Sequence, residues 1–386
     1  MQPFRSSSDP AGDDKGRHLA TVLDLFSGAG GMTQGFHASE AFRTVQAVEM
    51  DPQAAASYKA TFGDAVVHVR AISDWLANCD VPSVDVVVGG PPCQGFSTLG
   101  KQDAEDERNA LWHDYALTIV RAEPRYFVLE NVGAFLKSRQ FADLRAATEP
   151  GGLLADYDFE AGVLNAADFG AAQARRRTIL IGHHRELPAP GLPAPTHLGR
   201  HVTLRSVLDR VPRQVETTDL PPDRWTVVQG RRVPGPFRTS ELHVGRTYTE
   251  LSERRFRSIP AGGNRFDIPE QLLSPCWVKH KAGSADVMGR LSWDKPSVTI
   301  RTEFFKPEKG RYLHPDEHRA LTHLEAALIQ GFPDSHRWVG SKTSIARQIG
   351  NAVPIPLGRA IAAHLSQAMT RTTADDLIDL AVPVAV

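Results

Sequence analysis

The chain has 386 residues, of which 41% are hydrophobic and 23% are charged, and its net charge is −1. This composition is typical of a folded globular protein, and the length allows one large domain with a smaller one beside it. No run of 18 apolar residues occurs, which argues against a membrane span. Three scattered cysteines exclude a disulfide framework and do not form a metal-binding pattern.

Residues 1–18 are polar and lack the apolar segment of a secretory signal, so we expect a disordered tail and a protein of the reducing cytoplasm. The segments that follow predict a catalytic and cofactor-binding domain at residues 19–186, completed by residues 345–370. We expect a small domain at residues 187–344 and a second tail at residues 371–386.

The first predicted strand, residues 21–26, runs through a glycine-rich turn at residues 27–31 into a helix. This order predicts the first unit of a doubly wound, mostly parallel nucleotide-binding sheet. The dinucleotide pattern G-x-G-x-x-G is not met, because its third glycine would fall on Thr33. The next strand, residues 44–48, ends at Glu49, whose carboxylate suits the hydroxyls of a ribose; the alternative is a structural capping acid.

A second pair of strands ends in residues of chemical interest. The apolar run at residues 84–88 stops at a Gly-Pro-Pro turn that is followed by Cys93, and the run at residues 126–129 is followed by Glu130. Because parallel strands end at one edge of the sheet, we expect both side chains to face one crevice. A thiol there is a candidate nucleophile. The alternatives are a small buried cysteine and a structural acid.

Three arginines enter the strand predicted at residues 178–182. Side chains alternate along a strand, so Arg175 and Arg177 should share one face and Arg176 should lie on the other. We expect one face to look into the site and the other toward solvent or DNA.

The composition changes at residue 187, where proline and glycine become frequent. Residues 185–281 carry 16 Lys and Arg, 14 of them Arg, against 10 Asp and Glu. This excess indicates a polyanionic partner, although a solvated basic face is the alternative. Farther on, the sequence predicts a strand at residues 297–301, a helix at 323–330 capped by Thr322, and a last helix at 357–369.

Taken in order, the motifs resemble those of the cytosine-C5 DNA methyltransferases. The matching stretches are DLFSGAGG at 24–31, Glu49, PPCQGFS at 91–97, Glu130-Asn131-Val132, QARRR at 173–177, RALTHLEAALIQGFPD at 319–334 and QIGNAVPIPLGRAIA at 348–362. The resemblance implies an α/β fold: a Rossmann-like sheet of the class I methyltransferases and a smaller, loop-rich domain. The region at about 187–281 corresponds to the family's target-recognition segment.

The resemblance also implies a chemistry. Cys93 would add to carbon 6 of a cytosine flipped out of the duplex, which makes carbon 5 a nucleophile. Glu130 would bind N3 of the base, Arg175 would stabilise O2, and Arg177 would support them. No metal is expected.

S-adenosylmethionine is the methyl donor that the resemblance implies. Its implied binding residues are Phe26, Ser27, Gly28, Ala29, Gly30, Glu49, Met50, Ile72, Pro91, Asn351 and Val353. The family usually has an Asp before Ile72, where this chain has Ala71. Asp74 is the candidate substitute.

Double-stranded DNA is the expected partner, together with a cognate restriction endonuclease. The candidate DNA-binding residues are Gln94, Ser97, Arg176, Arg231, Arg232, Arg254 and Arg255. We expect a monomer in the bacterial cytoplasm, with a role in restriction-modification or related defence; the alternative is an orphan methyltransferase that has no partner nuclease.

Three other functions stay open. The first is an RNA (tRNA) cytosine-C5 methyltransferase, which the long basic segment disfavours. The second is a non-catalytic DNA-binding homologue, which intact Cys93, Glu130 and Arg175 disfavour. The third is a nicotinamide-dependent oxidoreductase, which the missing third glycine disfavours.

Overall fold

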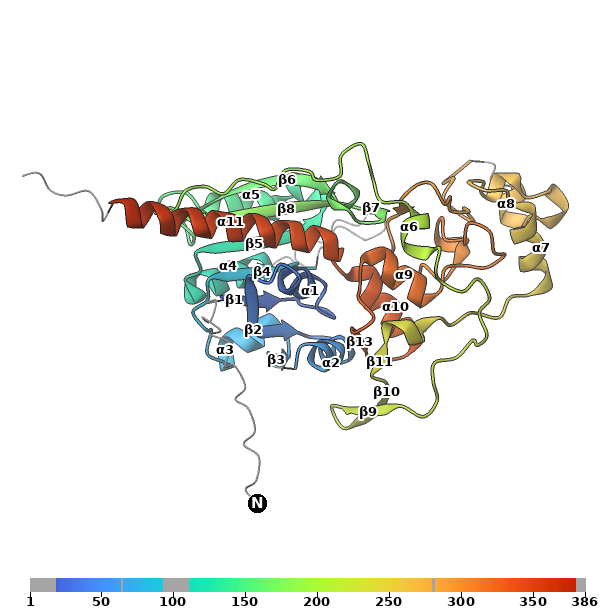
Figure 1. Cartoon of the computed structure of the whole chain (residues 1–386), viewed down its shortest axis with the longest axis horizontal. Helices are drawn as coiled ribbons and strands as arrows, with labels where there is room; N and C mark the ends of the chain where they lie inside the picture. The colour runs from blue at the N-terminus through green and yellow to red at the C-terminus, as the bar shows by residue number, and fades with distance from the viewer. Residues whose placement is uncertain (1–18, 64, 93–110, 280–281, 380–386) are drawn as a thin grey trace, which may run out of the picture.

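The computed structural model describes residues 19–63, 65–92, 111–279 and 282–379, with side chains as far as residue 371. Cys93, Gln94 and Ser97 therefore lie outside the described residues, as do residues 1–18. Figure 1 shows a layered sheet on the left, and a smaller group of short elements on the right. We call these the sheet region (the sheet and helices α1 to α5 and α11) and the smaller region (residues 187–351).

The described residues form a seven-stranded sheet of order β3-β2-β1-β4-β5-β8-β6. Its strands are β1 (Ala20–Leu25), β2 (Phe42–Glu49), β3 (Val66–Val69), β4 (Val86–Gly89), β5 (Tyr126–Val132), β6 (Tyr157–Asn165) and β8 (Arg176–His184). The first five strands of the order are parallel, and β8 runs antiparallel to both of its neighbours. The expected doubly wound, mostly parallel sheet is confirmed.

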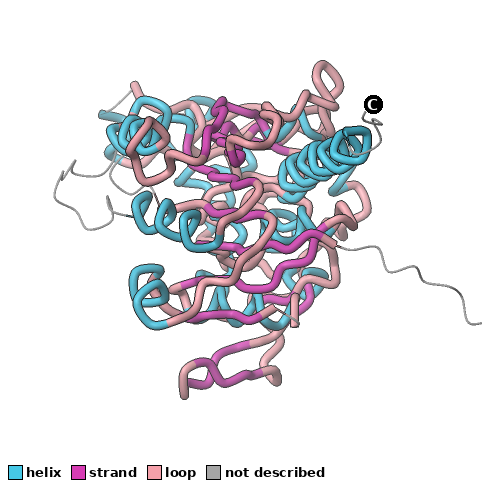
Figure 2. The backbone as a smooth tube through the Cα atoms, turned by 90° about the vertical axis from the view of Figure 1, so that its left-hand side faces the viewer, coloured by secondary structure: helices cyan, strands magenta, loops and turns pink. Residues whose placement is uncertain are grey.

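Helices cover both faces of this sheet, as the turned view in Figure 2 shows. They are α1 (Gly31–His37), α2 (Pro52–Thr61), α3 (Ile72–Asn78), α4 (Leu111–Ala122), α5 (Arg139–Ala147) and α11 (Ile355–Asp379). The short 3-10 helices η2 (Gly133–Lys137) and η3 (Ala166–Phe169) lie beside them. The last helix continues to Asp379, so the expected tail from residue 371 is wrong at its start.

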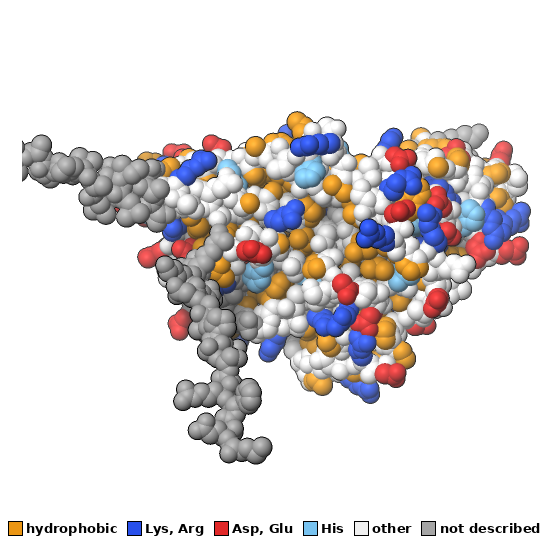
Figure 3. Space-filling model, in the orientation of Figure 1, with side chains coloured by type: hydrophobic (Ala, Val, Ile, Leu, Met, Phe, Trp, Pro, Cys, Tyr) orange, Lys and Arg blue, Asp and Glu red, His pale blue; other side chains and the backbone are white. Residues whose placement is uncertain are grey.

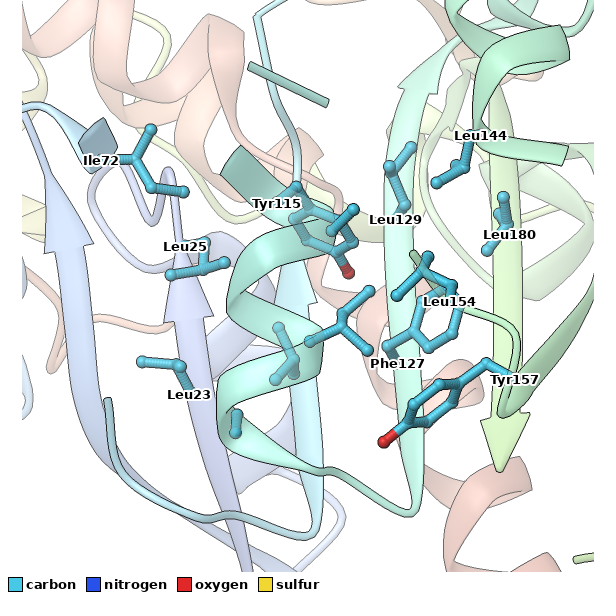
Figure 4. Packing of buried hydrophobic residues seen from close by; sticks show 14 of the residues in the cluster. Leu23, Leu25, Ile72, Tyr115, Phe127, Leu129, Leu144, Leu154, Tyr157 and Leu180 are labelled. Carbon is cyan, nitrogen blue, oxygen red and sulfur yellow. The ribbon is translucent and has the colours of Figure 1, made fainter. Parts of the chain in front are cut away.

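Alternation along the strands divides the core of the sheet region in two. On one face α3, α4 and α5 pack against residues such as Leu23, Leu129 and Leu180, and Figure 4 shows Tyr115 of α4 among them. On the other face α1 and α11 cover residues such as Val22 and Val128. The apolar strands predicted from the sequence are buried for this reason.

Helices α1 and α11 approach each other through glycine. A Cβ on Gly35 would lie 2.7 Å from the backbone nitrogen of Arg359, so only glycine fits there. This contact brings the end of the chain back onto the sheet region.

The smaller region has short elements joined by long loops, as expected. They are α6 (Leu204–Leu208), β9 (Trp225–Val228), β10 (Arg231–Pro234), β11 (Phe237–Arg238), η4 (Thr239–Leu242), α7 (Glu250–Ser258), η5 (Arg265–Asp267), η6 (Glu270–Leu272), α8 (Pro275–Lys279), β12 (Ser297–Val298), η7 (Pro307–Lys309), α9 (His323–Gln330), β13 (Arg337–Trp338) and α10 (Lys342–Asn351). Its apolar core includes Phe237, Phe304, Phe332 and Trp338. On the face shown in Figure 3, Lys and Arg side chains of this region are mixed with Asp and Glu.

The ends of α9 agree with the sequence. Thr322 caps the helix within a capping box with Glu325, and Gly331 ends it with a left-handed φ of 88°. The strand expected at residues 297–301 is only Ser297–Val298, which pairs in parallel with β7 (Gln173–Ala174). No helix of the described residues is long and apolar enough to cross a membrane.

Candidate active site

A cavity of about 1440 Å³ lies at the carboxyl ends of β1, β2, β4 and β5 and reaches the smaller region. The carboxyl edge of a parallel sheet is where such folds bind ligands. The expected site residues that line it are Phe26, Ser27, Gly28, Ala29, Glu49, Met50, Ile72, Pro91, Glu130, Arg175, Arg177, Arg231, Asn351 and Val353. Residues from distant parts of the sequence therefore line the same cavity.

The glycine turn holds Glu49 across the ends of β1 and β2. Gly28, with a left-handed φ of 55°, donates its backbone N–H to Oε2 of Glu49 at 2.8 Å. The backbone N–H of Asp51 donates to Oε1 at 2.7 Å. Burial raises the pKa of Glu49, and these two hydrogen bonds oppose the rise. The carboxylate is thereby fixed in the cavity wall.

Gly30 does not line the cavity, although the resemblance implied a donor contact there. It is the N-cap residue of α1, and a Cβ on it would lie 2.2 Å from the ring of Phe62. Glycine is needed at this position so that α1 can pack beside α2.

Asp24 is a site residue that sequence reasoning missed. Its side chain lines the cavity and is 1% exposed, and burial raises its pKa to about 7. The hydroxyl of Thr33 donates to Oδ2 of Asp24 at 2.5 Å and lies 2.8 Å from the hydroxyl of Tyr58. Thr33 stands where the third glycine of the dinucleotide pattern would be, and its hydroxyl binds this acid. The sequence signal that could have identified Asp24 is a charged residue within an apolar strand.

Asp74, the candidate substitute for the family's Asp, does not line the cavity. It forms an ion pair with Arg70 at 3.3 Å, and its Oδ1 accepts a hydrogen bond from Asn78. The cavity wall is made instead by Arg70, Ala71 and Ile72.

The Gly-Pro-Pro corner is held against β5. Asn131, 5% exposed, donates from Nδ2 to the carbonyl oxygen of Pro91 at 3.1 Å. A Cβ on Gly90 would lie 3.1 Å from Oε2 of Glu130, so the two strand ends approach closely. Pro92, the residue before Cys93, also lines the cavity.

Glu130 and Arg177 form an ion pair of 2.9 Å between Oε1 and Nε, and both side chains are mostly buried. Arg175 is 2% exposed, and its Nη1 donates to the carbonyl oxygens of Ile300 at 2.8 Å and Gly350 at 3.0 Å. Burial and then the nearby Arg177 lower its pKa to about 9. Its Nε has no hydrogen-bond partner among the described residues.

The predicted alternation of the three arginines agrees with the structure. Arg175 and Arg177 line the cavity, whereas Arg176 is exposed and lies outside its lining.

The other candidate DNA-binding arginines lie in different surroundings. Arg231 lines the cavity, while Arg232 stacks 4.7 Å above the ring of Trp225. Arg254 is exposed, but Arg255 donates from Nε to the carbonyl of Leu272 at 2.6 Å. Arg255 is therefore engaged in the packing of α7. The described residues contain no group of three His, Cys, Asp or Glu that could hold a metal ion.

Comparisons with known proteins agree with this geometry. The family model described as C-5 cytosine-specific DNA methylase matches residues 20–367. The Type II methyltransferase M.XorII of Xanthomonas oryzae pv. oryzae is 31% identical, covering 90% of this chain and 85% of the relative. The Type II methyltransferase M1.HphI of Haemophilus parahaemolyticus is 32% identical, covering 89% of this chain and 85% of the relative.

Solved structures share the fold. A protein described as a DNA modification methyltransferase encoded within a prophage (E. coli) has a TM-score of 0.66 at 23% identity, over 91% of this chain and 99% of that one. A mutant of Spodoptera frugiperda DNMT2 has a TM-score of 0.56 at 17% identity, over 91% of this chain and 99% of that one. The resemblance stated from the motifs is confirmed. Because the family match spans residues 20–367 and both relatives align over most of their own length, the protein belongs to the C-5 cytosine-specific DNA methylase family, and its activity is that of a DNA (cytosine-5) methyltransferase.

Proposed function

We propose that the protein transfers a methyl group from S-adenosylmethionine to carbon 5 of a cytosine flipped out of duplex DNA, within a specific sequence. The observation that carries this proposal is the shared cavity. Glu130, Arg175 and Arg177 line it together with Glu49 and the glycine turn. A base and a methyl donor bound there would be adjacent.

The residues at the glycine turn fit the donor. Glu49 presents a fixed carboxylate for ribose hydroxyls, and Met50 and Ile72 offer apolar surface for an adenine. Asp24 is a buried acid with no ion-pair partner among the described residues, which suits a positively charged ligand. When bound, S-adenosylmethionine supplies an electrophilic methyl group.

The base end of the cavity fits an addition mechanism. The thiolate of Cys93 forms a bond to carbon 6 of cytosine, and the electron pair of the C5–C6 double bond becomes available at carbon 5. Glu130 hydrogen-bonds or protonates N3, and Arg175 stabilises charge on O2. After methylation a base, for which water suffices, removes the proton from carbon 5. The C6–S bond then breaks and Cys93 leaves as a thiolate.

The test is replacement of the nucleophile. Cys93→Ser should abolish methylation of duplex DNA, while binding of S-adenosylmethionine by calorimetry stays within about twofold of wild type, since the thiol acts on the base. The control is Cys276→Ser, which changes an exposed cysteine of the smaller region and should retain activity. Full activity of Cys93→Ser would refute the covalent mechanism.

Bisulfite sequencing of plasmid DNA from cells that express the protein identifies the substrate. The plasmid should be methylated at cytosines of one short sequence context. Methylated tRNA with unmethylated plasmid would instead favour the RNA enzyme. Donor binding with neither product would favour the non-catalytic homologue.

The relatives are named Type II methyltransferases, which supports a role in restriction-modification in a bacterial cytoplasm. We further propose that the protein is a monomer and that a cognate endonuclease cuts the same sequence. Residues 19–186 with 345–370 would form the catalytic domain. Residues 187–344 would form the small domain, in which the region at about 187–281 would read the DNA. Size-exclusion chromatography with light scattering tests the monomer.

A further inference from the structure

Two buried glutamines connect β7, the short strand that precedes β8, to the smaller region. Gln173 lies on β7 and Gln330 at the end of α9, and each is 0% exposed. Nε2 of Gln173 donates to Oε1 of Gln330 at 2.6 Å. Neither residue lines the cavity.

The rest of each amide group is bound to backbone. Nε2 of Gln330 donates to the carbonyl oxygens of Ile349 at 2.5 Å and Ala352 at 3.4 Å. Oε1 of Gln173 accepts from the backbone N–H of Ile300 at 3.2 Å. These bonds fix the orientation of both amides, because reversing either would place donors against donors. An apolar replacement would leave buried polar groups without partners.

The backbone segments that the glutamines bind, at residue 300 and at residues 349–352, also carry the groups that support the site. The carbonyl oxygens of Ile300 and Gly350 are the two acceptors of Nη1 of Arg175. Gly350 directly follows Ile349, and Ala352 lies between Asn351 and Val353 in the cavity wall. One side chain, Gln330, thus contacts the segment that serves both ends of the cavity.

The two supporting segments also touch. A Cβ on Gly350 would lie 2.5 Å from the backbone of Arg301 and Thr302, so the end of α10 packs directly against the residues that follow Ile300. A shift of either segment would therefore displace the other.

We infer that Gln330 is a positioning residue for methyl transfer, which through Gln173 and residues 349–352 orients Arg175 at the base end and the Asn351–Val353 wall at the donor end. This inference rests on the proposed function of the cavity. Arg175 touches the base, whereas Gln330 acts only through the groups that it holds.

The experiment compares Gln330→Leu, Gln330→Glu and wild type, below the melting temperature of each variant. Gln330→Leu should lower kcat on duplex DNA on the order of 10²-fold, the effect of a small misplacement of a catalytic group. It should also weaken donor binding several-fold by calorimetry. Unchanged kcat and donor affinity in folded Gln330→Leu would overturn the inference.

Gln330→Glu distinguishes positioning from general destabilisation. When the carboxyl group introduced by Gln330→Glu is protonated, it retains one donor for Ile349 and one acceptor for Gln173, whereas the ionised carboxylate retains no donor. The activity of this variant relative to wild type should therefore rise as the pH falls from about 8.5 to 6. A constant ratio would contradict a hydrogen-bonding role, and this readout stands even if Gln330→Leu does not fold.

A mutant cycle tests the path through Arg175. In an Arg175→Lys background, Gln330→Leu should lower kcat less than about twofold further, while its effect on donor affinity persists. If Gln330→Leu and Arg175→Lys lowered kcat additively, Gln330 would not act on kcat through Arg175. The control is Thr239→Val, which removes a buried polar contact of the smaller region to Trp338 and should lower stability without changing kcat. If wild type methylates no cytosine, the proposed function fails, and donor affinity alone then tests the donor arm of the inference.

Discussion

Acids that line the cavity in the sheet region and three buried histidines of the smaller region have pKa values that burial shifts in opposite directions. In the sheet region burial raises the pKa of Asp24 and Glu49, which both line the cavity, and that of Asp114 on α4. In the smaller region burial lowers the pKa of His314 and His323 to about 4 and that of His336 to about 3. Asp24 and Glu49 belong to the site. His323 and His336 pack among aromatic side chains, as His336 does beside Trp338, whereas Nε2 of His314 lies 3.7 Å from Oε1 of Glu325.

The difference gives these acids and these histidines opposite responses to pH. A histidine with a lowered pKa in the folded state stabilises the fold above its unfolded value of 6.5, and this stability is lost as the pH falls toward about 4. A buried acid with a raised pKa, such as Asp24, stabilises the fold below 3.8, and this stability is lost as the pH rises through about 7. Lowering the pH should therefore destabilise the smaller region before it destabilises the sheet region.

The largest expected effect is acid unfolding of the smaller region. Each buried histidine should contribute a loss on the order of 3 kcal/mol between about pH 6.5 and 4, because one pKa unit is worth about 1.4 kcal/mol. Hydrogen exchange at pH 5 should increase in α9 and α10 before it increases in β1 and β4. His336→Phe should reduce the pH dependence of the melting temperature. If hydrogen exchange increased in β1 before it increased in α9 and α10, the predicted order of the two regions would be wrong.

The next effect contrasts two ion pairs. Glu325 is 1% exposed; burial opposes its ionisation, but Arg319 at 2.8 Å holds its pKa below the usual value. Arg319→Met should cost about 3–5 kcal/mol of folding free energy, since it leaves a buried charge unpaired, with little change in kcat. The matched variant Arg177→Met removes the partner of Glu130 and should lower kcat more than stability. Denaturant unfolding and single-turnover kinetics separate the two, and equal effects on kcat would refute the contrast.

A smaller effect is expected at Asp24. Asp24→Asn removes a charge that is unfavourable when buried, so without donor it should raise stability at pH 8 by roughly 2–4 kcal/mol and leave it nearly unchanged at pH 4. Melting curves across this pH range measure the difference. A loss of stability at pH 8 would show that the ionised form is needed for folding.

The smallest effect is at the β9–β10 hairpin. Arg232→Ala removes a cation over the ring of Trp225, which is 44% exposed, and should cost roughly 0.5–1 kcal/mol. Arg231→Ala, facing the cavity, should change stability less and substrate binding more. Thermal melting together with DNA and donor titrations checks both.

The sheet region was predictable from sequence because its signals are local. Buried parallel strands are apolar runs, and the glycine turn and the Gly-Pro-Pro corner mark where two of them end. Arg175 and Arg177 both line the cavity, as expected because side chains two residues apart in a strand lie on the same face.

The smaller region and several details of the site depend on tertiary contacts that sequence patterns do not carry. Helix α10 was not predicted, because its buried face includes polar residues such as Gln348, which binds Ser57 across the two regions. The strand expected at residues 297–301 ends early, and the carbonyl of Ile300 binds Arg175 instead. Asp74 lies outside the cavity lining, because a helix that starts at Ile72 pairs its carboxylate with Arg70.

The packing of α11 on α1 has a consequence for biosynthesis. Leu357, Ile361 and Leu365 cover the sheet face that carries Val22 and Val88, yet they are made after the whole smaller region. A nascent chain that has reached residue 350 therefore exposes one apolar face of a nearly finished sheet on the ribosome. An exposed apolar face of this kind favours chaperone binding and aggregation during translation. It closes only when the last helix emerges.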